Sequence, residues 1–211
     1  MPNWCSSHHV IYGDRSLVEE FFNSVEEIRK NVVSPEGTYN AENWLGNLVT
    51  VSGGDYQNVG CRGWICDSYV EPLPDGTASA TYIVEDAWGP NVEPFRMILD
   101  DLGFSNSLKH EWIAEEPACE VYVKSAGNEI LTEEYFLDIQ LEDPAIYTSE
   151  YFDSADAVLD WFRNPPKEVQ DIIIRNQEIT TIADIERLLD DFNSAYEYAY
   201  AGLHHFETET V

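Results

Sequence analysis

Carboxylates are the side chains of this sequence whose number and spacing could do chemistry. The chain holds 40 Asp and Glu against 11 Lys and Arg, which gives a formal net charge of −29. Paired carboxylates can carry general acid–base catalysis, bind calcium, or take the place of the phosphates of a nucleic acid. Among forty acidic residues a catalytic pair can be drawn almost anywhere, so the spacing has to decide between these uses.

The spacing places carboxylates on shared faces of predicted elements. Asp153, Asp156 and Asp160 follow helical spacing, and such positions lie about 5–6 Å apart, comparable with successive phosphates of one nucleic-acid strand. Few basic residues interrupt these faces to neutralise them. The predicted acidic contact set has ten members, four on strands or their turns and six on helices: Glu111, Glu115, Glu116 and Glu120; Asp153, Asp156, Asp160, Asp184, Asp191 and Glu197.

The net charge restricts the partners that such a protein can have. Duplex DNA carries one charge per ~1.7 Å of axis, so the chain carries the charge of roughly 50 Å of duplex. Such a surface repels nucleic acid and anionic membranes, and it attracts proteins whose sites hold phosphate. We therefore expect a basic DNA-binding protein as the partner and no direct binding to nucleic acid or membrane. Solubility, as on the acidic surfaces of halophilic proteins, is the alternative explanation of the charge.

Other chemistry finds little support in the sequence. His8 and His9 are neighbours on a predicted strand and point to opposite faces, so they form no ligand set with Cys5. His110 lies on the apolar side of its predicted strand, which favours a core histidine. Segment 190–193 lacks the glycine and the terminal Glu of a calcium loop. No nucleotide-binding or nucleophile-elbow motif is present. We expect no metal, no cofactor and no enzymatic activity.

The composition is that of a folded protein. Hydrophobic residues make up 44% of the chain, with 6 Trp, 12 Tyr and 9 Phe, and an acidic disordered segment would be poor in these types. The first residues show no basic and apolar pattern of a signal peptide, and no apolar run approaches the ~18 residues of a membrane span. Cytoplasmic, reduced thiols are the favoured interpretation of the four scattered cysteines, although the sequence leaves a disulfide open.

The first 148 residues are predicted to alternate strands and helices. Ser16 and Glu19 have the spacing of a capping box at the start of an amphipathic helix. The predicted helices are 16–30 and 94–102, and the predicted strands are 8–12, 48–51, 61–70, 78–84, 108–115, 119–124 and 134–141. This order indicates an α+β fold class, a ferredoxin-like antiparallel sheet with two helices and extra strands.

From residue 149 the pattern predicts helices only. Segment 154–164 ends at two prolines, a second helix runs over 166–176, and Thr181 caps a third whose apolar stripe continues to Ala199. We therefore predict two domains: a ferredoxin-like domain at 1–148 and an acidic helical subdomain at 149–211 packed on it.

The N-terminal two thirds resemble the YubB-like family of phages and plasmids, which has a ferredoxin-like domain. The resemblance rests on the opening Met1-Pro2-Asn3-Trp4-Cys5-Ser6, and further matches are 43–46, 87–90 and 116–117. It covers about residues 1–135. What it implies is a fold and a genomic setting, a mobile element in a bacterial cytoplasm, and no activity.

The C-terminal helices are more weakly similar to ArdA-type antirestriction proteins, over 154–162, 164–170 and 180–185. In that family, short acidic helices contribute to a protein that imitates bent DNA and occupies restriction enzymes. The N-terminal part does not resemble the first domain of that family, so the resemblance does not identify the target.

These observations predict a mobile-element inhibitor of a host defence system. It would act as an acidic DNA mimic in the DNA-binding site of a restriction enzyme, CRISPR effector or other nuclease, and a homodimer would lengthen such a mimic. The alternative is a protein-interaction module that binds through an apolar surface or the loops around Trp44 and Trp88, with the charge serving solubility. An enzyme, the third class, would need a concave pocket with clustered carboxylates.

Overall fold

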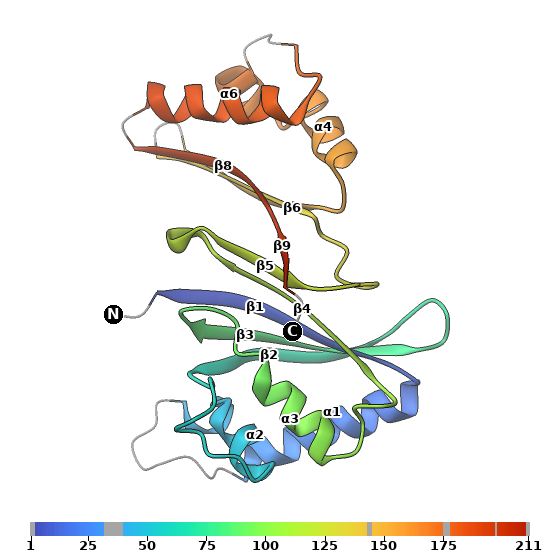
Figure 1. The fold of residues 1–211 in the computed structure, drawn as a ribbon. Coiled ribbons are helices and arrows are strands. Elements are labelled where there is room, and N and C mark those ends of the chain that lie inside the picture. Colours follow the sequence, from blue (N-terminus) through green and yellow to red (C-terminus); the bar gives the residue numbers. More distant parts are fainter. Residues whose placement is uncertain (1–2, 32–39, 143–144, 175–177, 197, 210–211) are drawn as a thin grey trace. The chain divides into compact units, whose positions relative to one another are not determined.

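The chain divides into two compact units, each with its own sheet and core. The computed structural model describes residues 3–31, 40–142, 145–174, 178–196 and 198–209 (Figure 1). Unit 1 comprises residues 1–131 and 208–211, and unit 2 comprises residues 132–207. The α+β class is confirmed. The predicted boundary after residue 148 is wrong, because the strand predicted at 134–141 belongs to the sheet of unit 2.

Unit 1 is built on a sheet of order β2-β3-β1-β4-β5-β9. β1 pairs antiparallel with β3 and β4, and the β2–β3 and β4–β5 pairs are antiparallel too. The strands are β1 (Trp4–Gly13), β2 (Gly63–Pro72), β3 (Ala78–Ala87), β4 (Lys109–Glu116), β5 (Val121–Ser125) and β9 (Glu207–Glu209). The helical segments are α1 (Arg15–Lys30), η1 (Ala41–Asn43), α2 (Gly46–Val51), α3 (Glu93–Asp101) and η2 (Pro117–Cys119).

Helix α1 follows the predicted periodicity but begins one residue earlier. Its buried stripe contains Val18, Phe21 and Val25, which pack in the core of unit 1. The N-cap is Asp14 and not Ser16, since the Asp14 carboxylate accepts hydrogen bonds from the backbone N–H groups of Ser16 and Leu17. The Ser16 hydroxyl also donates to Asp14, and this hydrogen bond and the two backbone ones lower the pKa of Asp14. Aspartate is as good a cap as serine, so composition alone could not choose between them.

Segment 48–51 is helical, and the predicted strand there is wrong. It lies in α2, where Leu48 and Val49 are buried in the core of unit 1. A four-residue apolar run fits a buried strand and a buried helix equally well, so periodicity cannot separate them. The predicted helix at 94–102 is confirmed as α3, and Gly103 follows it with a left-handed φ of +79°.

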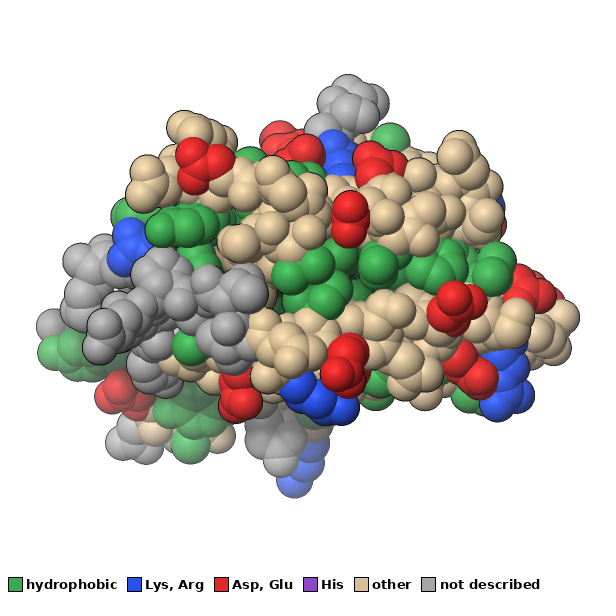
Figure 2. Space-filling model, turned by 90° about the horizontal axis from the view of Figure 1, so that it is seen from below, with side chains coloured by type: hydrophobic (Ala, Val, Ile, Leu, Met, Phe, Trp, Pro, Cys, Tyr) green, Lys and Arg blue, Asp and Glu red, His purple; other side chains and the backbone are tan. Residues whose placement is uncertain are grey.

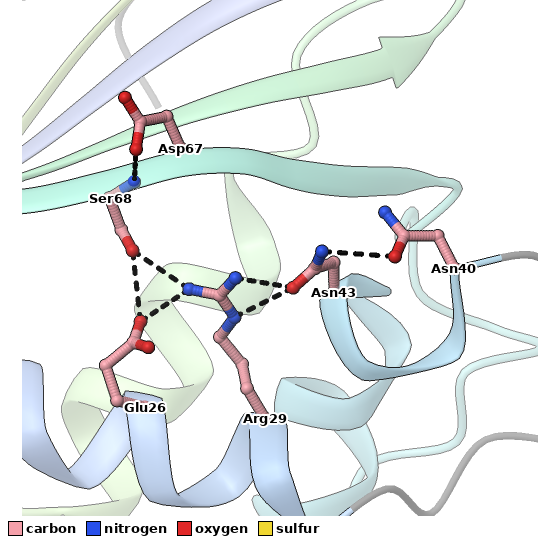
Figure 3. Close-up of polar contacts among 6 residues, drawn as sticks. All are labelled: Glu26, Arg29, Asn40, Asn43, Asp67 and Ser68. Atoms are coloured by element: carbon pink, nitrogen blue, oxygen red, sulfur yellow. Dashed lines mark hydrogen bonds and ion pairs between the residues drawn. The ribbon is translucent and has the colours of Figure 1, made fainter.

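One of the few cations of unit 1 joins three of its segments. Arg29 of α1 pairs with Glu26 and donates hydrogen bonds to Ser68 of β2 and to Asn43 of η1 (Figure 3). Asn43 in turn donates to Asn40. This guanidinium is mostly withdrawn from solvent, so it neutralises little of the surface charge.

Unit 2 combines a three-stranded sheet of order β7-β6-β8 with helices, and both of its strand pairs are antiparallel. The elements are β6 (Tyr135–Leu141), β7 (Ile146–Phe152), α4 (Ala155–Arg163), α5 (Lys167–Val169), the π-helical η3 (Gln170–Ile174), α6 (Ile182–Ala195) and β8 (Ala199–His205). The prediction of helices only after residue 149 is therefore wrong. The chain leaves α6 at Ala195, and the Asn193 side chain accepts from the Ala201 N–H and donates to the Ala201 carbonyl, which holds β8 against the helix.

Within the described residues, no helix is long and apolar enough to cross a membrane. The four cysteines are free; Cys5 and Cys61 are buried, whereas Cys66 and Cys119 are exposed.

Candidate functional site

The helices of unit 2 expose carboxylates as the sequence predicts. Ser154 caps α4, its hydroxyl accepting from the Ala157 N–H, and Val158 and Phe162 point into the core of unit 2. Asp156 and Asp160 of α4 and the preceding Asp153 are exposed. Their helical spacing away from the buried stripe thus places three carboxylates in solvent.

One carboxylate of helix α6 caps the start of the helix, and others are exposed to solvent. Asp184 forms a capping box with Thr181, and it also accepts from Thr180 and pairs with Arg187 at 2.9 Å. The hydrogen bonds from Thr180 and Thr181 lower the pKa of Asp184 to about 2. Asp191 is exposed, as are Glu186 and Asp190. Asp184 is therefore committed to the helix start, and Glu197 lies outside the described residues.

The charge of unit 2 is concentrated and weakly neutralised. Residues 132–207 contain 18 Asp and Glu and 4 Lys and Arg, whereas the larger unit 1 contains 22 and 7. Among the described side chains of unit 2, Lys and Arg form ion pairs only with Asp160 and Asp184. Asp153, Asp156, Glu186, Asp190 and Asp191 lack such a partner there. We call these five residues and Asp160 the acidic helical residues of unit 2.

Glu111 is not on the surface, and its assignment to the acidic contact set is wrong. The side chain is 4% exposed. Its carboxylate accepts hydrogen bonds from the Tyr12 hydroxyl and from the backbone N–H groups of residues 129, 130 and 131, at 2.6 to 3.0 Å. The polar side of β4 is covered by the chain that follows β5, so alternation along β4 did not reveal which face meets solvent. Glu111 thus anchors residues 129–131.

The other three carboxylates predicted on the sheet differ in their exposure to solvent. Glu116 is buried, and its Oε1 has no hydrogen-bond partner among the described atoms, so it too is wrongly assigned to the surface. Glu115 is half-buried and Glu120 is exposed, the latter in a left-handed conformation with φ +55°. Burial, reinforced by Asp86, Glu116 and Glu115, raises the pKa of the Cys5 thiol to about 12.

A buried chain of polar side chains crosses unit 1, and the sequence analysis did not find it. Asn91 donates to Asp86 Oδ1 at 2.7 Å, and the Ser7 hydroxyl donates to Asp86 Oδ2 at 2.5 Å. Ser7 Oγ lies 3.2 Å from His9 Nε2, and His9 Nδ1 lies 3.1 Å from His110 Nε2. Ser7, His9 and Asp86 are 0% exposed. His110 is thereby satisfied by a hydrogen bond, as expected.

The backbone explains how these groups meet. Ser7 and His9 are two residues apart on β1 and so share a face, and His9 lies opposite Trp112 in the β1–β4 register. The His9 ring stacks on Phe95 of α3 with centroids 4.3 Å apart. A Cβ at Gly63 would lie 2.3 Å from Asp86 Oδ1, so a glycine is required beside that carboxylate. In the sequence, the two-residue spacing of Ser7 and His9 on a predicted strand was the signal that these side chains lie on the same face.

Burial governs the protonation of this chain of groups. It raises the pKa of Asp86 to about 6, against the opposing hydrogen bonds from Ser7 and Asn91. It lowers the pKa of His110 to about 3, with a contribution from Arg96, and it lowers that of His9 well below its usual value. Both imidazoles are therefore neutral near pH 7. In the described part of the chain, no group of three or more His, Cys, Asp or Glu could hold a metal ion.

Unit 1 also exposes aromatic and aliphatic surface. Trp88 is 62% exposed and adopts a left-handed φ of +68°, with the Arg62 guanidinium 4.7 Å above its ring. Trp4 is also exposed and contacts Trp64, with ring centroids 5.3 Å apart. We call Trp4, Arg62, Trp64 and Trp88 the tryptophan patch. Trp44, by contrast, is half-buried and packs against the core.

The helical face of unit 1 carries a band of hydrophobic side chains with Asp and Glu on both sides (Figure 2). A shallow groove beside α1 is lined by Ile28, Val51 and Leu102 and by the carboxylates of Glu19, Glu20 and Glu27. Acidic residues therefore border apolar surface here, whereas on α4 and α6 they stand on the outer side of a packed helix.

Comparison with family models, with curated proteins and with solved structures finds no match to this chain. The sequence and the geometry of the two units are therefore the basis of the functional argument.

Proposed function

We propose that the protein is an acidic competitor for the DNA-binding site of a host defence protein, and that unit 2 carries the competing charge. The observation that carries the proposal is the set of acidic helical residues of unit 2, exposed on α4 and α6 with few cations among them. Carboxylates at helical spacing meet the same Lys and Arg side chains that hold phosphates.

The binding would be driven by long-range attraction. Complementary charge raises the association rate and makes the affinity depend on salt, because screening shortens the range of the attraction to about 8 Å at physiological ionic strength. The partner would be a restriction enzyme, a CRISPR effector or another nuclease with a basic DNA channel. The inhibitor would act stoichiometrically and would not turn over a substrate.

The topology of unit 1 supports the finer fold assignment. The chain order β1, α1, β2, β3, α3, β4 and the sheet order β2-β3-β1-β4 agree with a ferredoxin-like arrangement, extended by β5 and β9. This arrangement supports the resemblance to the YubB-like family, and with it a mobile-element origin in a bacterial cytoplasm, as part of the proposal.

A displacement experiment tests the function. A fluorescent 30-base-pair duplex is bound in turn to a purified restriction–modification enzyme and to a CRISPR effector with its guide, and the full-length protein is added at increasing concentration and at several salt concentrations. We expect stoichiometric displacement of the duplex from one of them, weakening as salt rises. Absence of displacement from all targets at low salt would refute the proposal.

The tryptophan patch supports a second candidate, a protein-interaction module. A large aromatic side chain held in a left-handed conformation and largely in solvent is costly, and such strain persists where the surroundings enforce it. Here the Trp88 N–H donates to the Asn3 carbonyl. Binding through this patch would survive high salt and would be lost in Trp88→Ala, whereas binding through unit 2 would respond in the opposite way.

A further inference from the structure

Unit 1 contains a cavity that the competition for DNA does not use. It has a volume of about 500 Å³, which lies in the range of small-molecule sites. Its polar lining comes from α3, β4 and the segments beside them, and includes Arg96, His110 and Trp112. Leu99 and Leu108 add apolar surface. The buried polar chain from Asp86 ends at this cavity, in His110.

The buried chain fixes which nitrogen of His110 is open to a ligand. Ser7 has one hydroxyl hydrogen and donates it to Asp86, so Ser7 Oγ accepts from His9 Nε2–H. Neutral His9 then has an unprotonated Nδ1, which accepts from His110 Nε2–H. Neutral His110 in turn has an unprotonated Nδ1. The group that His110 can offer to the cavity is therefore a hydrogen-bond acceptor.

The cavity also holds a cation without an ion-pair partner among the described residues. Arg96 is half-buried and forms no ion pair with any described carboxylate. Its guanidinium can bind the two oxygens of a carboxylate through two parallel hydrogen bonds. Trp112 also lines the cavity, but it is 1% exposed and its indole Nε1 is closed off from solvent-sized molecules.

The charges around the cavity select a zwitterion over a simple anion. Asp100 and Glu209 line it as well, and the protein carries a net charge of −29, so the field opposes a ligand with net negative charge. A ligand with both a carboxylate and an ammonium group avoids this cost. Its ammonium can donate to His110 Nδ1 and lie near the two acidic side chains.

We propose that this cavity binds a free α-amino acid with an aliphatic side chain. Arg96 binds the carboxylate, His110 Nδ1 accepts from the ammonium group, and Leu99 and Leu108 contact the side chain. The Asp86–Ser7–His9 chain acts as a positioning device, because it sets the tautomer of His110.

Nuclear magnetic resonance of the indole groups tests this site in the full-length protein at pH 7.5. The Trp112 Nε1–H resonance is assigned by its loss in Trp112→Phe, and L-alanine, L-valine and L-leucine are titrated in turn. Two matched probes lack one charge of leucine each, namely 4-methylpentanoate and 3-methylbutylamine. We expect a saturable shift of this resonance with at least one amino acid, at least tenfold tighter than with either probe. No shift with any amino acid, or an equal response to 4-methylpentanoate, would overturn the proposal.

Two arginine variants separate the site from the fold. Arg96→Met should weaken amino-acid binding at least tenfold, and Arg15→Met, which removes an exposed cation of α1, should leave it unchanged. The thermal unfolding of both variants is measured alongside. Unchanged binding in a folded Arg96→Met protein would contradict the assignment of the carboxylate site.

Discussion

The two units of this protein differ in how many of their described carboxylates they bury. Unit 1 withdraws Asp86, Glu111 and Glu116 from solvent, and two of the three have several hydrogen-bond donors around them. Unit 2 keeps its acidic helical residues in solvent, and it carries a net charge of −14 over 76 residues against −15 over 135 in unit 1. Unit 2 buries Asp138, which accepts hydrogen bonds from Gln140 and Ser149, so the two units differ in degree.

This difference shows that acidic content does not by itself describe a surface. A carboxylate can be buried where backbone N–H groups or hydroxyls replace its water, and the segment that supplies them becomes fixed in return. Where a helix already buries an apolar stripe, its remaining positions face solvent and the carboxylates there keep their hydration.

Glu111→Ala should cause the largest loss of stability. It leaves the Tyr12 hydroxyl and three backbone N–H groups without their acceptor. The free energy of unfolding should therefore fall by about 5 kcal/mol. Urea unfolding measures the loss, and hydrogen exchange should show reduced protection at residues 129–131. The matched variant Asp156→Ala in unit 2 should change stability by less than about 0.5 kcal/mol. Equal effects of the two variants would remove the distinction between the units.

Charge reversal in unit 2 should abolish competition with DNA. Asp153, Asp156 and Asp160 changed together to Lys should weaken target binding about a thousandfold, or ~4 kcal/mol, because three attractive contacts become repulsive. The control makes the same net change on unit 1 with Glu42, Glu71 and Asp101, which are exposed. If the control variant loses as much affinity for the target in the displacement assay, then the total charge determines binding and the assignment of the site to unit 2 is wrong.

Asp86→Asn should change how stability depends on pH. The folded pKa of Asp86 is about 6 and its usual value is 3.8, so the folded protein binds the extra proton between these values. The contribution of Asp86 to stability therefore falls as pH rises from about 4 to about 6, by about 3 kcal/mol in total. The Asp86→Asn protein should not show this fall in the free energy of unfolding, because the asparagine side chain does not titrate. Urea unfolding from pH 4 to 7 measures it, and parallel profiles for variant and wild type would contradict the burial argument.

Thr181→Ala should have the smallest effect, about 1 kcal/mol, through loss of the α6 cap. It changes the stability of unit 2 without changing its charge, whereas Thr181→Ser retains the hydroxyl and should be close to neutral. Target binding by the folded Thr181→Ala protein should equal that of wild type. A loss of affinity comparable to that of the charge reversal would show that the geometry of α6, and not its charge, controls binding.

The sequence predicted the elements whose pattern is local. The α1, α3, α4 and α6 helices follow from their apolar spacing, and the Thr181 cap follows from residue type. Two predictions that failed depend on contacts distant in sequence. Strand β8 pairs with β6, and Glu111 is buried by residues 129–131, and neither contact leaves a periodic signal. The cavity beside His110 also required the register of β1 and β4.

The chain leaves unit 1 after residue 131 and returns to it at residue 208 to form β9, so unit 2 is an insertion into the sequence of unit 1. An insertion of this kind can be exchanged as one segment, because only two peptide connections join it to the sheet of unit 1. Replacing residues 132–207 by a ten-residue linker would change the entropic contribution to the free energy of unit 1 folding by only about 2 kcal/mol, because the cost of closing a loop grows slowly with its length. We therefore expect the sheet of unit 1 to form without residues 132–207, once residues 131 and 208 are joined by this linker.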